Sequence, residues 1–430
     1  MNTRLYNARI LSMDGDCNIT EGEIWIAYDK ISYVGGALSD DEIAKKGVKF
    51  DISRDCNGNV LMPGFKDAHT HSAMTGMRSY ADDMPLWEWL STKIFPLEAK
   101  LSAEDMYEFA RLAMLEYLSG GITAVFDMYM HPEETARACE EMGIRYVGCC
   151  DINKFGPDIS EVSKRYKALN RDNGFCSYVV GFHAEYTCTK ELLAQISDIA
   201  AELGSPVFTH NSETRKEVDE CIERHGMTPT QLFESLDMFR NGGGGYHCVY
   251  LDDEDIEIFK KHDLTVVTNP GSNTKLASGI APISKYLDNG IRVAIGTDGP
   301  SSNNNLDMFK EMFLVTGLAK LNDMDAAAVV PREVLKMATV NGAKCMGLND
   351  CDVLAVGKKA DIVMIDMHQP NMQPINNIAD NIVYSGSRAN VKMTICNGKI
   401  MYEDGKFNIG DDPEKIYEKA NELMAKYKDQ

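Results

Sequence analysis

Short apolar stretches alternate with helical stretches through the middle of this 430-residue chain, and this alternation restricts the possible folds more than any other feature. The strand-like stretches are apolar almost throughout, which is typical of parallel strands covered by helices on both faces. There are eight of them, at residues 60–71, 122–129, 144–152, 177–186, 206–211, 245–249, 264–269 and 291–298. Eight strands favour a closed, TIM-like (β/α)8 barrel over an open sheet.

The two ends of the chain have a different pattern, with short alternating strands and turns. These strands are expected at 5–11, 23–28, 30–34, 361–365, 391–396 and 399–402, before a final helix at 413–428. We therefore predict an α/β protein with a catalytic barrel at 58–351. Residues 1–57 and 352–430, including the C-terminal helix, are predicted to form one small β-sandwich domain from both termini.

Composition excludes several classes of function. The net charge of -21 would repel phosphates, so a nucleic acid polymer is not expected as a partner. The sequence has no run of eighteen apolar residues and no apolar core of a signal peptide near its first residue, so we expect a cytoplasmic protein without a membrane partner. The twelve cysteines form no C-x-x-C pair, which is typical of reduced cytosolic thiols.

Potential metal ligands lie at the ends of four predicted strands, where barrel enzymes carry their catalytic residues. His69 and His71 end the first strand, and their spacing lets both side chains point to the same face. His210, His247 and Asp298 end the fifth, sixth and eighth strands. Imidazole nitrogens with a carboxylate suit zinc, with iron or manganese as alternatives. A single strand histidine is more often a core residue, so the metal site is predicted from the convergence of all five.

The sequence motifs around these residues resemble those of the amidohydrolase superfamily, and the resemblance extends over nearly the full chain. They are Pro63-Gly64-Phe65 through His69-Thr70-His71, the unit His210-x-x-Glu213, and Gly296-Thr297-Asp298-Gly299 with Ser302-Asn303-Asn304. More narrowly, the chain is similar to the 5'-methylthioadenosine and S-adenosylhomocysteine deaminases. The residues that carry this similarity are Arg78, Ala81-Asp82-Asp83, Leu86, Trp89-Leu90, Ile94, Pro96, Leu97 and Glu98.

The resemblance implies that His69, His71, His210 and Asp298 bind one divalent metal ion, with Zn²⁺ expected and Fe²⁺ or Mn²⁺ as alternatives. Superfamily members with two metals bridge them by a carboxylated lysine on the fourth strand, which here ends at His183 without a lysine. A bound ion lowers the pKa of water to about 7 and so provides hydroxide at neutral pH. In a deaminase of this type, the hydroxide attacks C6 of the purine and ammonia is released.

Three residues receive catalytic roles from the resemblance. Asp298 is expected to accept the proton of the attacking water, and Glu213 to carry a proton to the ring nitrogen beside the attacked carbon. His247 is expected to orient the hydroxide and stabilise developing charge. On spacing alone Glu213 could equally be a surface carboxylate, and His247 could be a further metal ligand; we place His247 outside the ligand set.

Substrate recognition is also inferred from the resemblance. Glu98 matches a residue that accepts hydrogen bonds from ribose hydroxyls, and Trp89 and His183 match residues that line a nucleoside pocket. Glu213 and Asp298 complete the predicted substrate-binding set. The alternative for Trp89 is ordinary core packing, because tryptophan is often buried.

One departure from the relatives concerns the substrate tail. Relatives that take S-adenosylhomocysteine present two arginines to its carboxylate, and the matching positions here are Cys150 and Asp158. Neither can bind a carboxylate, and Asp158 would repel it, although Lys154, Lys164 or Arg165 could compensate. We therefore predict a deaminase of adenine nucleosides that prefers 5'-methylthioadenosine, 5'-deoxyadenosine or adenosine to S-adenosylhomocysteine.

Two other functions remain open from the sequence. The first is a different hydrolase of cyclic amidines on the same metal site, namely a guanine or pterin deaminase or a triazine hydrolase, because the attack is common to all. The second is a non-catalytic scaffold homologue, which would be expected to lose metal ligands that this chain retains. A homo-oligomer is an analogy with the relatives, and the sequence itself does not indicate one.

Overall fold

The computed structural model describes residues 1–15, 18–171 and 174–428. Eight parallel strands of this described part form the central sheet, in the order of the sequence. They are β6 (Phe65–Thr70), β7 (Ile122–Asp127), β8 (Arg145–Cys149), β9 (Cys176–Gly181), β10 (Val207–Asn211), β11 (Gly243–His247), β12 (Thr265–Thr268) and β13 (Arg292–Ile295). Thr70 and Asp298 form a parallel bridge between the first strand and the segment after the last, which closes the sheet. The predicted TIM-like barrel is confirmed.

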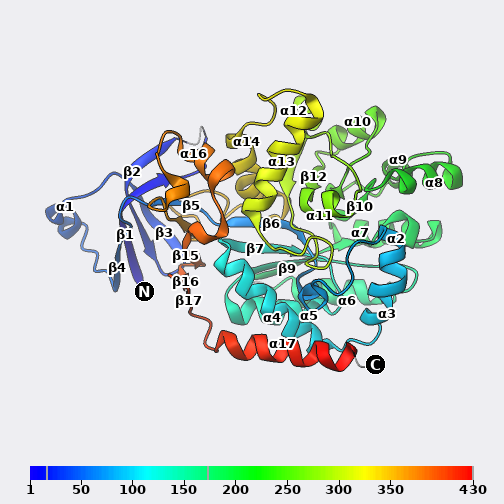
Figure 1. Ribbon diagram of the computed structural model, residues 1–430, viewed down its shortest axis with the longest axis horizontal. Coiled ribbons are helices and arrows are strands. Elements are labelled where there is room, and N and C mark those ends of the chain that lie inside the picture. Colours follow the sequence, from blue (N-terminus) through cyan, green and yellow to red (C-terminus); the bar gives the residue numbers. More distant parts are fainter. Residues whose placement is uncertain (16–17, 172–173, 429–430) are drawn as a thin grey trace.

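Helices surround this sheet, as Figure 1 shows. They are α4 (Ala103–Ser119), α5 (Pro132–Met142), α6 (Ser160–Leu169), α7 (Lys190–Leu203), α8 (Arg215–His225), α9 (Pro229–Ser235), α10 (Asp253–Lys261), α11 (Pro270–Lys275), α12 (Ile283–Asp288), α13 (Met308–Asp323), α14 (Pro331–Lys336) and α15 (Gly342–Cys345). Local signals fix their ends. Ser102 and Asp105 form a capping box at the start of α4, and Gly204 ends α7 in the left-handed conformation.

Short helical turns fill the connections. Between β6 and α4 lie η1 (Ser72–Met77), α2 (Leu86–Trp89), η2 (Leu90–Ile94) and α3 (Phe95–Glu98). Elsewhere the chain forms α1 (Asp40–Lys45), η3 (Glu185–Thr187), η4 (Met337–Asn341), η5 (Pro370–Met372), α16 (Ile378–Asp380), η6 (Asn381–Ser385) and η7 (Arg388–Asn390). No helix within the described ranges is long and apolar enough to cross a membrane.

Strands from both termini form a second, mixed sheet beside the barrel (Figure 1). In the described residues its order is β17 (Lys406–Phe407), β16 (Lys399–Glu403), β15 (Val391–Cys396), β14 (Ile362–Ile365), β5 (Val60–Pro63), β1 (Asn2–Leu11), β2 (Ile19–Ala27) and β3 (Lys30–Gly35), with β4 (Ile52–Asp55) pairing with β1. The antiparallel pairing of β5 with β14 joins the two ends of the chain. A β-sheet formed by strands from both termini is therefore confirmed, while the predicted sandwich domain at 1–57 and 352–430 stays a prediction.

The stretch at 60–71, which the alternation predicts as one strand, is divided at Gly64. β5 belongs to the terminal sheet and β6 to the barrel. A Cβ atom on Gly64 would lie 2.2 Å from Cγ2 of Thr123, so a larger residue here would clash with the Thr123 side chain. The chain thus passes from one sheet to the other directly before the strand that carries His69.

The last helix, α17 (Pro413–Lys428), lies along α4 on the outside of the barrel, as Figure 1 shows. Ala420 and Tyr427 are buried there. The Tyr427 hydroxyl donates a hydrogen bond to Oδ2 of Asp105 over 2.6 Å. This helix therefore packs against the barrel.

A buried ion pair connects the barrel to the terminal sheet. Nε of Arg145, the first residue of β8, is 2.6 Å from Oδ2 of Asp361, and both side chains are buried. Asp361 precedes β14, and it also accepts a hydrogen bond from the backbone N–H of Asn397 over 2.7 Å. Burial alone would raise the pKa of Asp361, but Arg145 and Lys66 hold that pKa below its ordinary value of 3.8.

Candidate active site

The carboxyl ends of four barrel strands bring the predicted metal ligands together. His69 lies in β6, His210 in β10 and His247 at the end of β11, while Asp298 follows β13. His247 and Asp298 have left-handed backbone conformations, with φ of 67° and 59°. Such conformations are uncommon for residues other than glycine and are often found at functional sites. Here they turn the chain at the mouth of the barrel, where the side chains converge.

Four buried side chains form a group that could hold a metal ion. The ligand atoms of His69, His210, His247 and Asp298 all lie within 4.8 Å of one another. His71 contacts the same group, because its Nε2 atom is 3.1 Å from Oδ1 of Asp298, and Nε2 of His69 is 3.4 Å from that oxygen. The structure therefore brings together all five residues that the strand ends predicted.

The hydrogen bonds around the histidines fit metal binding. Nδ1 of His71, His210 and His247 each lies at hydrogen-bonding distance from an acceptor: the carbonyl oxygen of Met128, the carbonyl oxygen of His183 and Oδ1 of Asn273, respectively. An imidazole that donates through Nδ1 presents the lone pair of Nε2 to a metal. Both ring nitrogens of His69 are buried without a hydrogen-bond partner among the described residues, which a metal ion would relieve.

For three of the candidate ligands, His69, His210 and Asp298, the electrostatics favour the protonation states that metal ligands need. Burial lowers the pKa of His69 to about 3 and that of His210 well below its ordinary value, so both are neutral at pH 7. Burial opposes ionisation of Asp298, but the adjacent His69 and His71 imidazoles hold its pKa well below 3.8. Burial opposes the charged form of His71, but the Asp298 carboxylate beside it raises its pKa to about 9, so His71 would have to lose a proton to bind an ion. Two neutral imidazoles beside an ionised carboxylate are otherwise suitable donors for a divalent cation.

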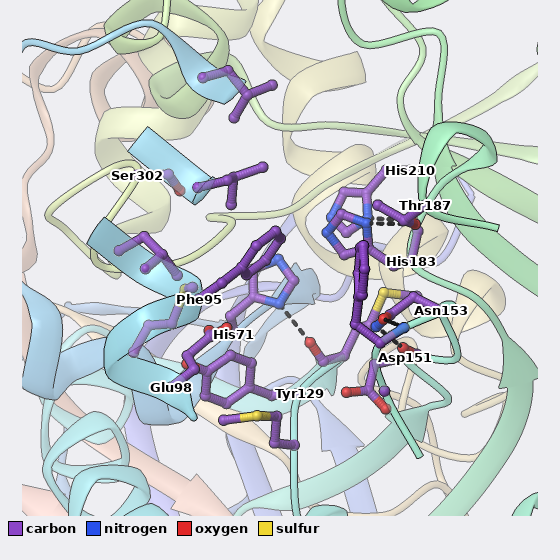
Figure 2. A pocket seen from close by; sticks show the side chains of 18 of the residues that line it. His71, Phe95, Glu98, Tyr129, Asp151, Asn153, His183, Thr187, His210 and Ser302 are labelled. Carbon is purple, nitrogen blue, oxygen red and sulfur yellow. Dashed lines mark hydrogen bonds between the residues drawn. The ribbon is translucent and has the colours of Figure 1, made fainter. Parts of the chain in front are cut away.

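A cavity of about 550 Å³ opens beside this cluster, and Figure 2 shows the side chains around it. Its walls contain every residue predicted for proton transfer or substrate binding, namely Trp89, Glu98, His183, Glu213, His247 and Asp298. One wall comes from α2, η2 and α3, and another from residues 151–157 after β8. A cavity of this size, mostly apolar with a few convergent polar groups, suits a small molecule.

Glu213 lies buried between the cluster and the cavity. Its Oε1 accepts a hydrogen bond from the Ser278 hydroxyl over 3.0 Å, and its Oε2 is 4.0 Å from Nε2 of His247. Its backbone N–H donates to the Glu217 carboxylate over 2.8 Å, within the capping box that starts α8. Burial raises the pKa of Glu213. The carboxyl group is therefore held at a fixed position from which it can exchange a proton with a ligand.

Glu98 and Trp89 line the cavity from the segment before α4. Oε1 of Glu98 accepts a hydrogen bond from the Tyr129 hydroxyl over 2.6 Å, and burial raises the pKa of Glu98 to about 7. Trp89 is only 4% exposed and packs in an apolar cluster with Leu90 and Ile94. It therefore belongs both to the cavity wall and to a hydrophobic core.

The site also has polar residues for which the sequence predicted no role. Ser302 donates from its hydroxyl to Oδ2 of Asp298 over 2.8 Å, while Tyr129 and Asp151 follow β7 and β8. The strand-end rule that found the histidines could have found Tyr129 and Asp151, because both lie within the last two residues of predicted strands. Ser278 lies in a loop after α11, and no sequence signal marked it.

The two positions matched to the arginines of the relatives do not face the cavity. Cys150 is buried in the main hydrophobic core, and Asp158 is exposed. Asp151, directly after Cys150, lines the cavity instead. Among the described residues that line it there is no lysine and no arginine, so neither Lys154, Lys164 nor Arg165 supplies a cation to its wall.

Comparisons with known proteins agree with this site. The amidohydrolase family matches residues 60–401. The chain is 40% identical over 425 residues to a 5-methylthioadenosine/S-adenosylhomocysteine deaminase of Caldanaerobacter subterraneus subsp. tengcongensis, covering 97% of this chain and 96% of the relative. It is 38% identical over 432 residues to a 5'-deoxyadenosine deaminase of Methanosarcina acetivorans, covering 98% of each.

A solved structure shares both the fold and the extent of the chain. It is an adenosine deaminase from Xanthomonas campestris with bound zinc, which superimposes with a TM-score of 0.93 at 27% identity and covers 100% of this chain and 99% of that one. The matched family segment includes the barrel and every residue of the histidine and aspartate cluster. The chain belongs to the amidohydrolase family.

Proposed function

We propose that this protein is a metal-dependent hydrolytic deaminase of adenine nucleosides. The observation that carries the proposal is the placement of Glu213 and Glu98 in one cavity with the histidine and aspartate cluster. The cluster can hold an ion that activates water, and Glu213 can transfer a proton to a ring nitrogen. Glu98 can accept hydrogen bonds from the two vicinal hydroxyls of a ribose. The names of the 5'-methylthioadenosine/S-adenosylhomocysteine and 5'-deoxyadenosine deaminases, at about 40% identity, support the same substrate class.

The residues proposed to hold one zinc ion are His69, His71, His210 and Asp298, with His247 as an adjacent group. Zinc is favoured because the donors are imidazole nitrogens with one carboxylate, and because a similar structure contains zinc. When bound there, the ion supplies Lewis-acid activation of water at neutral pH. Since His247 belongs to the group of four with mutually close ligand atoms, it is the first alternative as a ligand.

The protein's own side chains move the protons. Asp298, whose Oδ2 accepts from the Ser302 hydroxyl, takes a proton from the attacking water. Glu213 gives a proton to the ring nitrogen beside C6 and is held in place by Ser278. His247, oriented by Asn273, stabilises the charge that develops on the oxygen that attacks C6. The C6–O bond forms, and the proton taken up by Asp298 passes to the exocyclic amine. The C6–N bond to that amine then breaks, ammonia leaves, and the remaining hydroxyl proton returns to Glu213 as the C6=O bond forms.

The cavity favours a nucleoside without a negative tail. No described lining residue is a lysine or arginine, whereas Glu98, Asp151, Glu213 and Asp298 are all acidic. A carboxylate at the 5' end would be desolvated among like charges, which is unfavourable. We therefore propose adenosine, 5'-deoxyadenosine and 5'-methylthioadenosine as preferred substrates over S-adenosylhomocysteine.

An ultraviolet assay of the zinc-loaded protein tests the proposal directly. We expect the adenosine-to-inosine absorbance change and stoichiometric ammonia with 5'-substituted adenosines, at a kcat/KM of about 10⁴ M⁻¹s⁻¹ or higher for the best substrate. Guanine, a pterin and an aminotriazine serve as comparison substrates. Ammonia from one of these, with none from any adenosine analogue, would contradict the proposal.

A further inference from the structure

One carboxylate in the cavity has no part in the reaction described above. Glu98, Asp151, Glu213 and Asp298 are the acidic side chains among the described lining residues. Three of them already have a proposed role: Asp298 binds the metal ion, Glu213 transfers a proton and Glu98 binds the ribose. Asp151 is the fourth, and its surroundings indicate what it contacts in the loaded enzyme.

The backbone around Asp151 is fixed. Ile152 forms an isolated parallel bridge with Phe182, and the backbone N–H of Lys154 donates to the carbonyl oxygen of Thr187 over 2.9 Å. The side chain of Asn153 donates from Nδ2 to the carbonyl oxygen of Asp151 over 3.0 Å. The half-buried carboxylate is therefore held at the wall of the cavity by the segment that carries it.

The protein leaves the Asp151 carboxylate poorly compensated. Arg165, a backbone hydrogen bond, His71 and His131 each favour its charged form, with Arg165 having the largest effect. Nε of Arg165, however, already pairs with Oε1 of Glu133 at 3.3 Å. Burial raises the pKa of Asp151, and Glu98 is close enough for the two charges to repel. An acidic group in this position is best satisfied by a hydrogen-bond donor or a cation that enters with the ligand.

The proposed substrate orientation places the sugar beside Asp151. The purine must lie against Glu213 and the histidine cluster for attack at C6, and Glu98 takes the 2' and 3' hydroxyls. Figure 2 shows Asp151 and Asn153 on the opposite side of the view from Glu98 and Phe95. With the vicinal hydroxyls turned toward Glu98, the 5' end of the sugar is directed to the other wall, which residues 151–157 form.

We infer that Asp151 selects nucleosides whose 5' end carries a hydrogen-bond donor, either a hydroxyl or an ammonium group, over those with a methyl, thioether or carboxylate-bearing 5' end. This inference rests on the proposed deaminase function and narrows its substrate class. Asp151 accepts the 5' donor and repels a carboxylate, so it acts on specificity by attraction and by exclusion.

Kinetics with matched 5' substituents test this role. The substrates are adenosine, 5'-amino-5'-deoxyadenosine, 5'-deoxyadenosine and 5'-methylthioadenosine, and the variants are Asp151→Asn and Asp158→Asn. Since Asp158 is exposed outside the cavity, its variant is the matched control. In the unaltered enzyme we expect kcat/KM to be about tenfold or more higher for the two donor-bearing substrates, because hydrogen bonds to charged groups are strong.

Asp151→Asn is expected to lower kcat/KM for the amino and hydroxyl substrates by about tenfold to a hundredfold, while 5'-deoxyadenosine changes less than about threefold. Asp158→Asn should leave all four unchanged. Equal losses of kcat/KM on every substrate would assign Asp151 a structural role and overturn the inference. A preference of the unaltered enzyme for 5'-deoxyadenosine or 5'-methylthioadenosine would also overturn it. If the unaltered enzyme deaminates none of the four, the proposed function itself fails and the inference fails with it.

Discussion

At the scale of single residues, a substitution at Glu213 best distinguishes proton transfer from metal binding. It contacts Ser278 and approaches His247, but it is not among the side chains proposed to hold the ion. We expect Glu213→Gln to lower kcat by about 10²-fold to 10⁴-fold, because an amide cannot transfer the proton. Zinc content, measured by elemental analysis, should remain at about one ion per chain.

Glu220→Gln is the matched control for this variant, since Glu220 lies on the following helix, α8, and pairs only with Lys216 and Arg224 among the described residues. Its kcat should stay within about twofold of the unaltered enzyme, because surface ion pairs contribute little. Normal turnover in Glu213→Gln would show that another group carries the proton. Loss of zinc from it would assign Glu213 to the metal instead.

The residues of the site differ in how far the sequence predicts them. The histidines and Asp298 are predictable because each stands at a strand end and few residue types bind metals. Asp151 also stands at a strand end, but aspartate is common in turns, so its position alone does not distinguish a cavity wall from a solvated loop. Ser278 reaches Glu213 only through the fold, across 65 positions of sequence.

At the scale of elements, the candidate ligands connect strands that are distant in the sequence. β6, β10, β11 and the segment after β13 each contribute to the cluster. A metal ion bound only by the folded chain stabilises it, by about 4 kcal/mol at a thousandfold excess over Kd. We expect removal of the ion with a chelator to abolish deamination and to lower the melting temperature by several degrees, and added zinc to restore both.

His210→Ala provides the control for the chelator. The alanine variant lacks one proposed ligand, so its melting temperature should already be low and should not respond to the chelator. A chelated, metal-free sample that retains full activity would contradict a metal-dependent mechanism. An equal response of both proteins to the chelator would show that the effect arises outside this site.

The positions of helices and strands are predicted well where the spacing of apolar residues determines them. They are predicted less well where tertiary contacts determine them. The eight barrel strands and the helix Pro413–Lys428 follow from apolar spacing alone. The division of 60–71 into β5 and β6 does not, because both parts are apolar and their spacing does not mark the point at which the chain passes from one sheet to the other. Likewise, no sequence pattern indicated that α17 packs on α4, since its apolar face fits any apolar partner.

At the scale of the whole molecule, the pair of Arg145 with Asp361 joins the barrel to the terminal sheet. Removing one member of a buried ion pair leaves the other charge uncompensated, so Asp361→Asn should reduce the free energy of unfolding by about 3 to 5 kcal/mol. Denaturant unfolding measures this. Because the pKa of Asp361 is lowered in the folded state, its contribution is present above its ordinary pKa of 3.8 and is lost as the pH falls through the lowered pKa.

The pair of Arg54 with Glu403 is a suitable control, because it also links distant segments but is partly exposed. Its Nε–Oε1 distance is 2.9 Å, with side chains 43% and 25% exposed. Arg54→Gln should change the free energy of unfolding by less than about 1 kcal/mol. Similar losses for both variants would show that burial of the Arg145 pair adds nothing to its effect.

Asp298 has a role both in the candidate active site and in the closure of the barrel. Its carboxylate faces the histidines, while its own backbone forms the bridge to Thr70 that closes the barrel, in a conformation that asparagine tolerates better than most other residues. An alanine at position 298, introduced to make an inactive reference protein, would remove the metal ligand and would also disturb the bridge to Thr70 that closes the barrel. Studies that need a silent but correctly shaped enzyme, for crystallising a trapped substrate or for calorimetry, are better served by a substitution at Glu213.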